Sequence, residues 1–198
     1  MSCGLFCALA LLRPRTESGL GVVLLMCPER ILESPCPLPF DTSTITLRRA
    51  RLDEADALSD LIFRAKAAIG YDDAFMEAVR EDMVITREDI EGRELWVAER
   101  EAVLGCGSLA LLPDGVSGEI KTMFIEPGVK RGGIGTLLLE HLFARAQSLG
   151  LSRLELEAEP TAVPFYEKHG FVVFGDSPST LIEGRSLPLM QRDLGQGK

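Results

Sequence analysis

The sequence lacks the residue patterns of several common functional sites. It has two histidines and no C-x-x-C pair, so the spacing of its ligand-type residues predicts no zinc site. It also lacks the G-x-x-x-x-G-K-[ST] phosphate loop and a Ser-His-Asp arrangement around a nucleophile elbow. Four of the five cysteines (Cys3, Cys7, Cys27 and Cys36) precede residue 40. The fifth, Cys106, stands in an apolar strand-like run, so we expect a small core residue and no internal disulfide framework.

Positive charge is also in short supply. The chain has 21 Lys and Arg against 30 Asp and Glu, which gives a formal net charge of -9. Binding to nucleic acid regardless of sequence needs a basic face that displaces counterions, so this balance argues against a nucleic-acid partner. It mildly favours a cationic substrate. With 46% hydrophobic residues, the 198-residue chain suffices for one globular domain with a sizeable core.

No apolar run is long enough to cross a bilayer, which takes roughly 20 residues in a helix. The N-terminal part has two shorter apolar patches, at residues 5–12 and 19–26, followed by a Pro-rich run at 28–39. Charges follow the first patch, whereas a secretory signal would place them before it. We therefore expect residues 1–43 to be a disordered extension, with Met26 as an alternative start and a targeting segment as the minority alternative. The expected location is cytoplasmic, without a membrane partner.

From Ile45 the apolar pattern becomes regular. The alternation over Ile45–Arg48 predicts a strand, and Asp53 is expected to cap a helix that ends at Gly70. A second helix is expected over Asp72–Asp82, with an apolar stripe along one side. This stripe either packs on the core or covers a substrate pocket.

The rest of the chain alternates between predicted strands and predicted helices. Strands are predicted at Glu94–Arg100, Val103–Leu112, Glu119–Ile125, Arg153–Glu157, Phe171–Phe174 and Ser186–Gln191, and helices at Gly133–Ser148 and Ala162–His169. Tight turns join the first three of these strands into an antiparallel meander. The order as a whole predicts an α/β fold whose sheet is mixed in strand direction.

A glycine-rich turn precedes the longest predicted helix, with the sequence Val129-Lys-Arg-Gly-Gly-Ile-Gly-Thr136. Its glycines let the backbone turn tightly and expose successive N–H groups. The positive end of the following helix points at whatever the turn holds. The pattern indicates a cradle for an anion with more than one phosphate; a close-packed helix start is the alternative.

Three segments together resemble the GCN5-related N-acetyltransferase (GNAT) superfamily: Glu119-Ile-Lys-Thr-Met-Phe-Ile125, Lys130-Arg-Gly-Gly-Ile-Gly135 and Phe165-Tyr-Glu-Lys-His-Gly-Phe171. The resemblance spans about residues 44–194 and leaves 195–198 as a tail. It implies a GNAT-like, mostly antiparallel central sheet with flanking helices and a splayed parallel strand pair. It also implies direct transfer of an acetyl group from acetyl-CoA to a primary amine, without a metal.

The resemblance also implies which residues contact the coenzyme. In the family the turn reads Gln/Arg-x-x-Gly-x-Gly/Ala and holds the coenzyme pyrophosphate; here Lys130 replaces the usual Gln or Arg. The strand before the turn is bulged in the family and offers backbone groups to the pantetheine arm. The cofactor-binding residues implied are Met123, Phe124, Ile125, Val129, Lys130, Arg131, Gly132, Gly133, Ile134, Gly135, Thr136 and Lys168.

Two catalytic residues follow from the same resemblance. Tyr166 occupies a position that approaches the coenzyme sulfur, and a phenol, with an unperturbed pKa of about 10, can donate a proton to the departing thiolate. The alternative for Tyr166 is a core aromatic. Glu119 lies eleven residues before Lys130, the separation of the general base in the histone-acetylating branch. A solvent-facing strand residue is its alternative, and Glu157 is a weaker candidate base. Glu159 replaces an asparagine frequent in the family and is left out of the catalytic set.

The expected partner is a small-molecule or peptide amine acceptor, with a homodimer as one alternative for the assembly. Arg185 and residues 178–184 precede the last strand, where acceptor specificity often resides in the family. His141 and His169 are expected to be structural or exposed. The competing function is a non-catalytic acyl-CoA-binding regulatory domain of the same fold, and a P-loop nucleotide-binding protein ranks far below.

Overall fold

The computed structural model describes residues 41–179 and 184–195. These residues belong to one unit that spans Pro37–Lys198. The predicted N-terminal extension, with Met26 and the first four cysteines, lies outside the described residues except for residues 41–43. Most of the predicted tail and residues 180–183 lie outside them as well.

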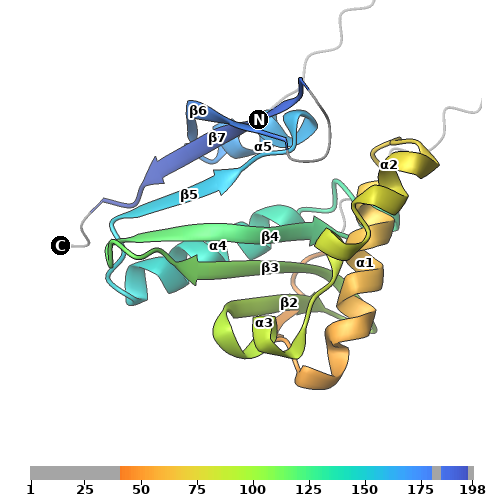
Figure 1. Cartoon of the computed structure of the whole chain (residues 1–198). Coiled ribbons are helices and arrows are strands. Elements are labelled where there is room, and N and C mark those ends of the chain that lie inside the picture. Colours follow the sequence, from red (N-terminus) through yellow and green to blue (C-terminus); the bar gives the residue numbers. More distant parts are fainter. Residues whose placement is uncertain (1–40, 180–183, 196–198) are drawn as a thin grey trace, which may run out of the picture. The chain divides into compact units, whose positions relative to one another are not determined.

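The described residues form one seven-stranded sheet with helices on both sides. The strands are β1 (Thr46–Arg49), β2 (Glu94–Glu99), β3 (Val103–Leu111), β4 (Ser117–Ile125), β5 (Arg153–Glu157), β6 (Val172–Pro178) and β7 (Ser186–Asp193). The α-helices are α1 (Ala55–Ala67), α2 (Asp73–Ala78), α3 (Arg87–Gly92), α4 (Ile134–Ser148) and α5 (Val163–Lys168). The strand order is β1-β2-β3-β4-β5-β7-β6, and only β4 and β5 pair in parallel (Figure 1). The predicted mixed, mostly antiparallel sheet is confirmed.

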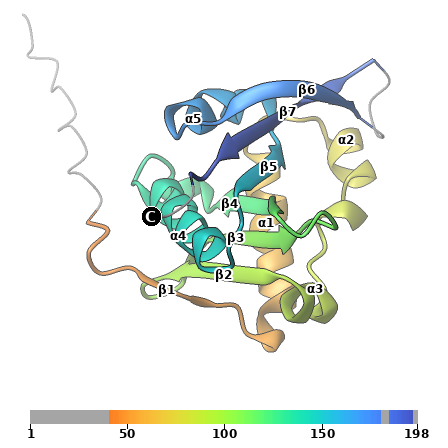
Figure 2. The same ribbon diagram turned by 90° about the vertical axis from the view of Figure 1, so that its left-hand side faces the viewer.

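Helices α1 and α4 cover opposite faces of the sheet (Figure 2). Successive side chains of a strand point to opposite faces, so neighbouring residues of β2 join different clusters. Val97 packs with Cys106 and the buried side of α1, whereas Ala98 packs with Leu138 of α4. Cys106 is a buried core residue as predicted, and burial raises the pKa of its thiol to about 12.

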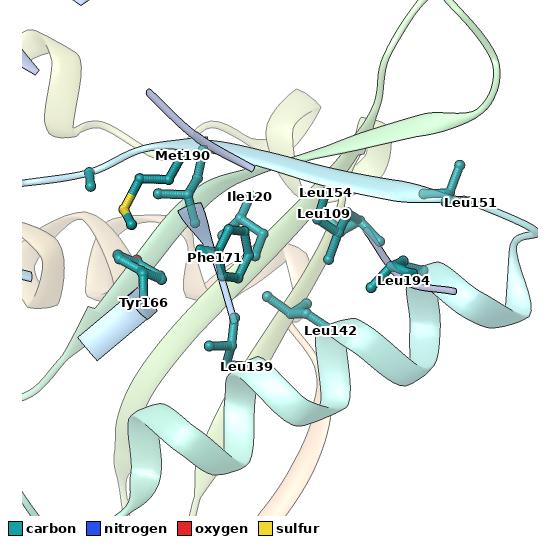
Figure 3. Close-up of a cluster of buried hydrophobic side chains, with 13 residues drawn as sticks. Leu109, Ile120, Leu139, Leu142, Leu151, Leu154, Tyr166, Phe171, Met190 and Leu194 are labelled. Atoms are coloured by element: carbon teal, nitrogen blue, oxygen red, sulfur yellow. The ribbon is translucent and has the colours of Figure 1, made fainter. Parts of the chain in front are cut away.

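A third hydrophobic cluster joins α4 and α5 to the C-terminal strands (Figure 3). Leu139 and Leu142 of α4 meet Phe171 and Met190, and Tyr166 of α5 lies at one end of the cluster. Each large apolar side chain buried in this way contributes about 1.5–3 kcal/mol. The cluster therefore fixes α5, and with it Tyr166, against α4.

The start of α1 differs from the prediction. Glu54 is the N-cap residue, and the side chain of Asp53, the predicted cap, is 84% exposed. The reason is Arg48, whose guanidinium donates to the two carboxylate oxygens of Glu54 at 2.8 and 2.6 Å. These bonds hold the pKa of Glu54 down at about 2, and they favour a 3-10 turn over Leu52–Glu54 before the helix.

The second predicted helix is shorter than expected, and a third one follows it. Helix α2 ends at Ala78, and Glu81–Met83 form a separate 3-10 turn. Asp72 caps α2 by accepting a backbone N–H three residues further on at 2.8 Å. Helix α3 was not predicted; Thr86 and Asp89 form a reciprocal capping box at its start.

Strand β4 is bulged and separates from β5. Ser108 of β3 lies opposite Thr122, but the next β3 residue lies opposite Ile120, so Lys121 is the extra residue of a bulge. Parallel pairing with β5 ends at Glu119. From Ile120 onward, the edge of β4 that faces β5 pairs with no strand of the described chain, and the two strands diverge in Figure 1. The predicted splayed parallel pair is confirmed.

Candidate active site

The glycine-rich turn leads directly into the N-terminus of α4. A 3-10 turn over Pro127–Val129 precedes it, and Gly133 is the N-cap of α4 with a φ of +83°. Arg131 has a φ of +67°, the one positive value among non-glycine residues in ranges 41–179 and 184–195. Left-handed backbone is uncommon outside glycine and clusters at functional sites. Here it turns the chain so that several N–H groups stay available.

Five backbone N–H groups at this turn have no acceptor in the described part of the chain: those of Arg131, Gly133, Ile134, Gly135 and Thr136. The first N–H groups of an α-helix lack partners within the helix, and the helix dipole adds partial positive charge there. The side chains of Lys130 and Arg131 are exposed, and neither is ion-paired to a described residue. Together these groups suit an anion with several phosphate oxygens.

Gly135 packs the turn against α5. A Cβ placed on Gly135 would lie 3.4 Å from the ring of Phe165, so the site has room for little more than a methyl group. The ring of Phe165 in turn meets the ring of Tyr166 edge to face, with centroids 5.2 Å apart. The glycine-rich turn and the helix that carries Tyr166 are therefore in direct contact.

Tyr166 is buried, with 7% of its surface exposed. Its ring contacts Phe165 and Phe171, and its hydroxyl forms no hydrogen bond with a residue of the described ranges. Burial raises the pKa of the phenol above its ordinary value, so Tyr166 is protonated at neutral pH. A proton donor must have this protonation state.

The predicted pantetheine strand presents its backbone rather than its side chains. Phe124 packs with the cluster under α1, whereas Met123 and Ile125 pack with the clusters under α4. Val129 also packs against the α4 side. Any contact of these residues with a ligand in the gap between β4 and β5 would therefore be made by N–H and C=O groups. Lys168 lies exposed in the last turn of α5.

Glu119 lies where the parallel pairing of β4 and β5 ends, opposite Glu155 of β5. Its side chain is 23% exposed and forms an ion pair with Lys121 Nζ at 3.0 Å. Ile120 belongs to the cluster under α4, so Glu119 faces the α1 side. Tyr166, which belongs to the cluster under α4, and Glu119 therefore lie on opposite sides of the sheet. Glu157, the weaker candidate base, is exposed.

A pocket of about 290 Å³ opens beside Lys121 on the α1 side of β4. Its polar lining comes from Asp82, Asp89, Arg93, Lys121 and Thr122. Asp89 and Arg93 form an ion pair at 2.6 Å. The volume is at the lower end of the range for small-molecule sites.

A polar cluster on the α1 and α2 side was not predicted. We call it the Glu159 cluster; it comprises Lys66, Tyr71, Phe75, Glu159 and Arg185. Glu159 Oε2 accepts from Lys66 Nζ at 2.6 Å, and Oε1 accepts from the Tyr71 hydroxyl at 2.6 Å. Arg185 Nη2 donates to the same Oε1 at 2.7 Å and also to the Tyr71 hydroxyl oxygen. Glu159, which was not predicted to be a catalytic residue, is thus the centre of a dense network.

The two cations of the Glu159 cluster lie over aromatic rings. Lys66 Nζ is 5.1 Å and Arg185 Cζ is 5.0 Å from the centroid of the Tyr71 ring, and both lie 5.9 Å from that of Phe75. Burial alone would raise the pKa of Glu159, but the hydrogen bonds from Lys66 and Tyr71 hold it below its ordinary value. The apolar stripe predicted for this region therefore has two roles: Tyr71 and Phe75 support cations, while the rest is core.

The two histidines have structural contacts. The ring of His141 meets Trp96 at 4.0 Å between centroids, and His169 Nδ1 lies 2.8 Å from the carbonyl oxygen of Phe165. Within residues 41–179 and 184–195, no group of three or more His, Cys, Asp and Glu is placed to hold a metal ion. No helix of those ranges has the length and apolar character needed to cross a membrane.

Comparison with known proteins finds acetyltransferases that are similar to this chain. Residues 91–173 match the model of the acetyltransferase (GNAT) domain. The chain is 32% identical to the peptidyl-lysine N-acetyltransferase YjaB of Escherichia coli over 148 residues, which cover 74% of this chain and 94% of that protein. It is 42% identical to an IAA acetyltransferase of Azospirillum brasilense over 79 residues, or 38% of this chain and about half (52%) of that relative.

A solved structure shares the fold. The PaiA N-acetyltransferase of Thermoplasma acidophilum in complex with coenzyme A matches with a TM-score of 0.62 at 17% identity. The match covers 75% of this chain and 98% of that one. The open mixed sheet with its parallel β4–β5 pair is therefore an arrangement that a coenzyme A complex also contains.

Proposed function

Since this chain belongs to the GCN5-related N-acetyltransferase superfamily, we propose that it transfers an acetyl group from acetyl-CoA to a primary amine by direct attack. One observation carries the proposal: the gap between β4 and β5 leads to a turn with five available N–H groups and two exposed cations. A generic helix start would supply the N–H groups alone. The gap also leaves one edge of β4 unpaired within the described chain, and an extended ligand such as the pantetheine arm of coenzyme A can pair with that edge.

The proposed cofactor contacts follow from this geometry. The pyrophosphate accepts hydrogen bonds from the turn between Arg131 and Thr136, and Lys130 adds a charge-assisted contact. Lysine supplies a point charge rather than the planar fork of arginine, so it fixes the phosphates less strictly. The pantetheine arm pairs with the backbone of Met123–Ile125 along the free edge of β4. Lys168 lies at the end of α5 as a further cation for the nucleotide.

The proposed reaction needs three proton transfers. The acceptor ammonium loses a proton to Glu119, directly or through water, because only the neutral amine has a lone pair for attack. The amine nitrogen then bonds to the acetyl carbon, and backbone N–H groups of β4 stabilise the oxyanion. The carbon–sulfur bond breaks, and the thiolate takes the hydroxyl proton of Tyr166. The nitrogen still carries an extra proton after attack and releases it to water or to the Tyr166 phenolate, and Tyr166 is thereby protonated again from the amine or from solvent. The products are an acetylated amine and free coenzyme A.

The proposed acceptor is an amine on a small molecule or a peptide. The E. coli relative is called a peptidyl-lysine N-acetyltransferase, which supports an amine acceptor here. We also propose a cytoplasmic location. The one cysteine of the described ranges, Cys106, is a free thiol, which suits a reducing compartment.

The test of the function is an acceptor screen that follows thiol release from acetyl-CoA, run beside calorimetry with coenzyme A. We expect binding of coenzyme A and turnover with a subset of amines. Arg131→Ala should weaken binding, and Arg87→Ala, a change at an exposed arginine of α3, should not. Absence of coenzyme A binding would refute the proposal. Tight binding without turnover of any amine would favour a regulatory acyl-CoA-binding domain.

A further inference from the structure

We propose that the Glu159 cluster binds a carboxylate of the acceptor, so that the acceptor is an amine that also carries a carboxylate group. This inference rests on the proposed acetyl transfer and names the substrate class of that site.

The charges of the Glu159 cluster do not balance. Lys66 and Arg185 are both cationic, and Glu159 is the one carboxylate bonded to them within the described residues. The three side chains are only 15%, 17% and 15% exposed. An uncompensated charge withdrawn from water is unfavourable, and a partner of opposite sign offsets the cost. One further carboxylate would make the cluster neutral.

Donors remain for that carboxylate. Arg185 donates to described residues through Nη2 alone, although a guanidinium carries five N–H groups on three nitrogens. Lys66 uses one of its three ammonium N–H groups, on Glu159. The rings of Tyr71 and Phe75 lie close to both cations and hold them in place. A ligand carboxylate could therefore bond to both cations without displacing Glu159.

The Glu159 cluster lies on the side from which an acceptor would approach. Lys66 is in the last turn of α1, Tyr71 precedes α2, and Glu159 follows β5. Helices α1 and α2 lie across the sheet from α4, whose N-terminus holds the proposed phosphate site (Figure 2). A cofactor bound there leaves the α1 side open to the second substrate. Glu119, the proposed base, also faces this side.

The charges of the Glu159 cluster favour a different class of acceptor from the one that the net charge of the chain favours, and the local charges outweigh the net charge. The net charge of -9 favours a cationic acceptor through long-range attraction. Salt screens exposed charges beyond about 8–10 Å, whereas partly buried charges in contact are screened much less. The contact partners of the acceptor therefore decide its class, and here they are two cations.

The test compares matched acceptors in the thiol-release assay. Glycine, L-lysine, L-glutamate and L-phenylalanine are each compared with their carboxamides, with rates expressed per neutral amine. A lysine tripeptide with a neighbouring glutamate, and its glutamine counterpart, test whether the carboxylate belongs to a peptide. We expect kcat/KM for a carboxylate member to exceed that of its amide by about ten-fold or more, as a charge-assisted hydrogen bond provides.

Arg185→Gln tests the cluster itself. It should raise KM for the carboxylate member by about ten-fold and leave the amide member within about two-fold, so the discrimination is lost. Lys66→Met should act in the same direction. Arg87→Gln is the matched control and should leave the ratio unchanged, because Arg87 is exposed on α3. Circular dichroism confirms that each variant folds.

Two outcomes of the activity assay overturn the inference: wild-type protein that uses both members of every pair equally, or an Arg185→Gln variant that loses activity toward both members equally. If no acetyl transfer is detected, calorimetry of the same acceptor pairs with coenzyme A-loaded protein tests the Glu159 cluster separately from the chemistry. Carboxylate-dependent binding that Arg185→Gln abolishes would support the cluster even without turnover. Calorimetry that finds no such binding refutes it.

Discussion

Replacing Tyr166 with phenylalanine should separate chemistry from stability, because the two are expected to respond differently. The substitution removes one oxygen atom and leaves the ring contacts with Phe165 and Phe171 in place. If Tyr166 protonates the leaving thiolate, kcat should fall by about 10²–10⁴-fold. That loss corresponds to about 3–5 kcal/mol in the activation free energy.

The stability of the Tyr166→Phe protein should hardly change. The hydroxyl donates to no described residue, so no protein hydrogen bond is lost with it. The hydroxyl is also largely withdrawn from water, because Tyr166 is only 7% exposed. Burying a hydroxyl without a hydrogen bond costs free energy, and its removal relieves part of that cost. We expect the free energy of unfolding to stay within about 1 kcal/mol of the wild type, or about 2–4 °C in Tm.

The assay pairs thermal unfolding with thiol release under saturating acetyl-CoA. Phe171→Leu is the matched control. Phe171 is 2% exposed and its ring contacts that of Tyr166, but its side chain has no polar group. It should lose about 1–3 kcal/mol of stability and much less activity than Tyr166→Phe. Unchanged kcat in Tyr166→Phe would refute the role of the hydroxyl as proton donor. A drop in Tm matching that of the control would show that the hydroxyl is structural.

Three further changes probe other parts of the molecule. Gly135→Val should weaken coenzyme A binding by about ten-fold or more, since the added side chain meets the Phe165 ring, 3.4 Å from the Cβ position. Arg48→Met should lower the free energy of unfolding in urea by about 2–4 kcal/mol, because the side chain of Glu54 is only 10% exposed. The same pair contributes to acid stability. The pKa of Glu54 is about 2 in the folded state, so its contribution is complete above pH about 4.5 and is lost as pH falls toward 2. Glu119→Gln should reduce kcat/KM by about 10²-fold near neutral pH, and less at high pH, where the acceptor amine is already neutral.

Each of these predictions has a result that would contradict it. Gly135→Ala serves as the control for Gly135→Val and should bind coenzyme A nearly as well as the wild type; equal affinity of the valine variant would show that the turn lies outside the site. An acid transition that Arg48→Met leaves unchanged would assign acid unfolding to other carboxylates. A loss in Glu119→Gln that stays constant with pH would exclude proton removal as the role of Glu119.

The sheet was predictable because its signals are local. Alternation over β1 to β4 and the glycines before α4 each lie within a few residues, and the structure has all the strands that they predict. Asp53 was chosen as a cap from its residue type, but Arg48 bonds to Glu54 instead, and the contact depends on how β1 lies beside the helix. Helix α3 could have been found, since the spacing of Thr86 and Asp89 is that of a capping box.

The Glu159 cluster could not be predicted from the sequence in the same way. Lys66 and Glu159 are 93 residues apart, and Arg185 follows Glu159 by 26. No local pattern connects them, and each alone is an ordinary charged residue near the end of an element. Glu159 was even set aside because it departs from the asparagine frequent in the family. Its contacts come from parts of the chain that meet only in the folded protein.

The pairing between β4 and β5 is short. It divides the sheet into two parts, which we call leaves, joined by only a few residue pairs. One leaf runs from β1 to β4 and the other contains β5 to β7, and the ladder that joins them covers only Ser117–Glu119. On the α1 side, Lys66 of the first leaf forms an ion pair with Glu159 of the second, and Glu159 forms another with Arg185. An acceptor that engages Lys66 and Arg185 would therefore contact the ion pairs that join the two leaves on this side. Substrate selection and the width of the gap between β4 and β5 would then depend on the same few side chains.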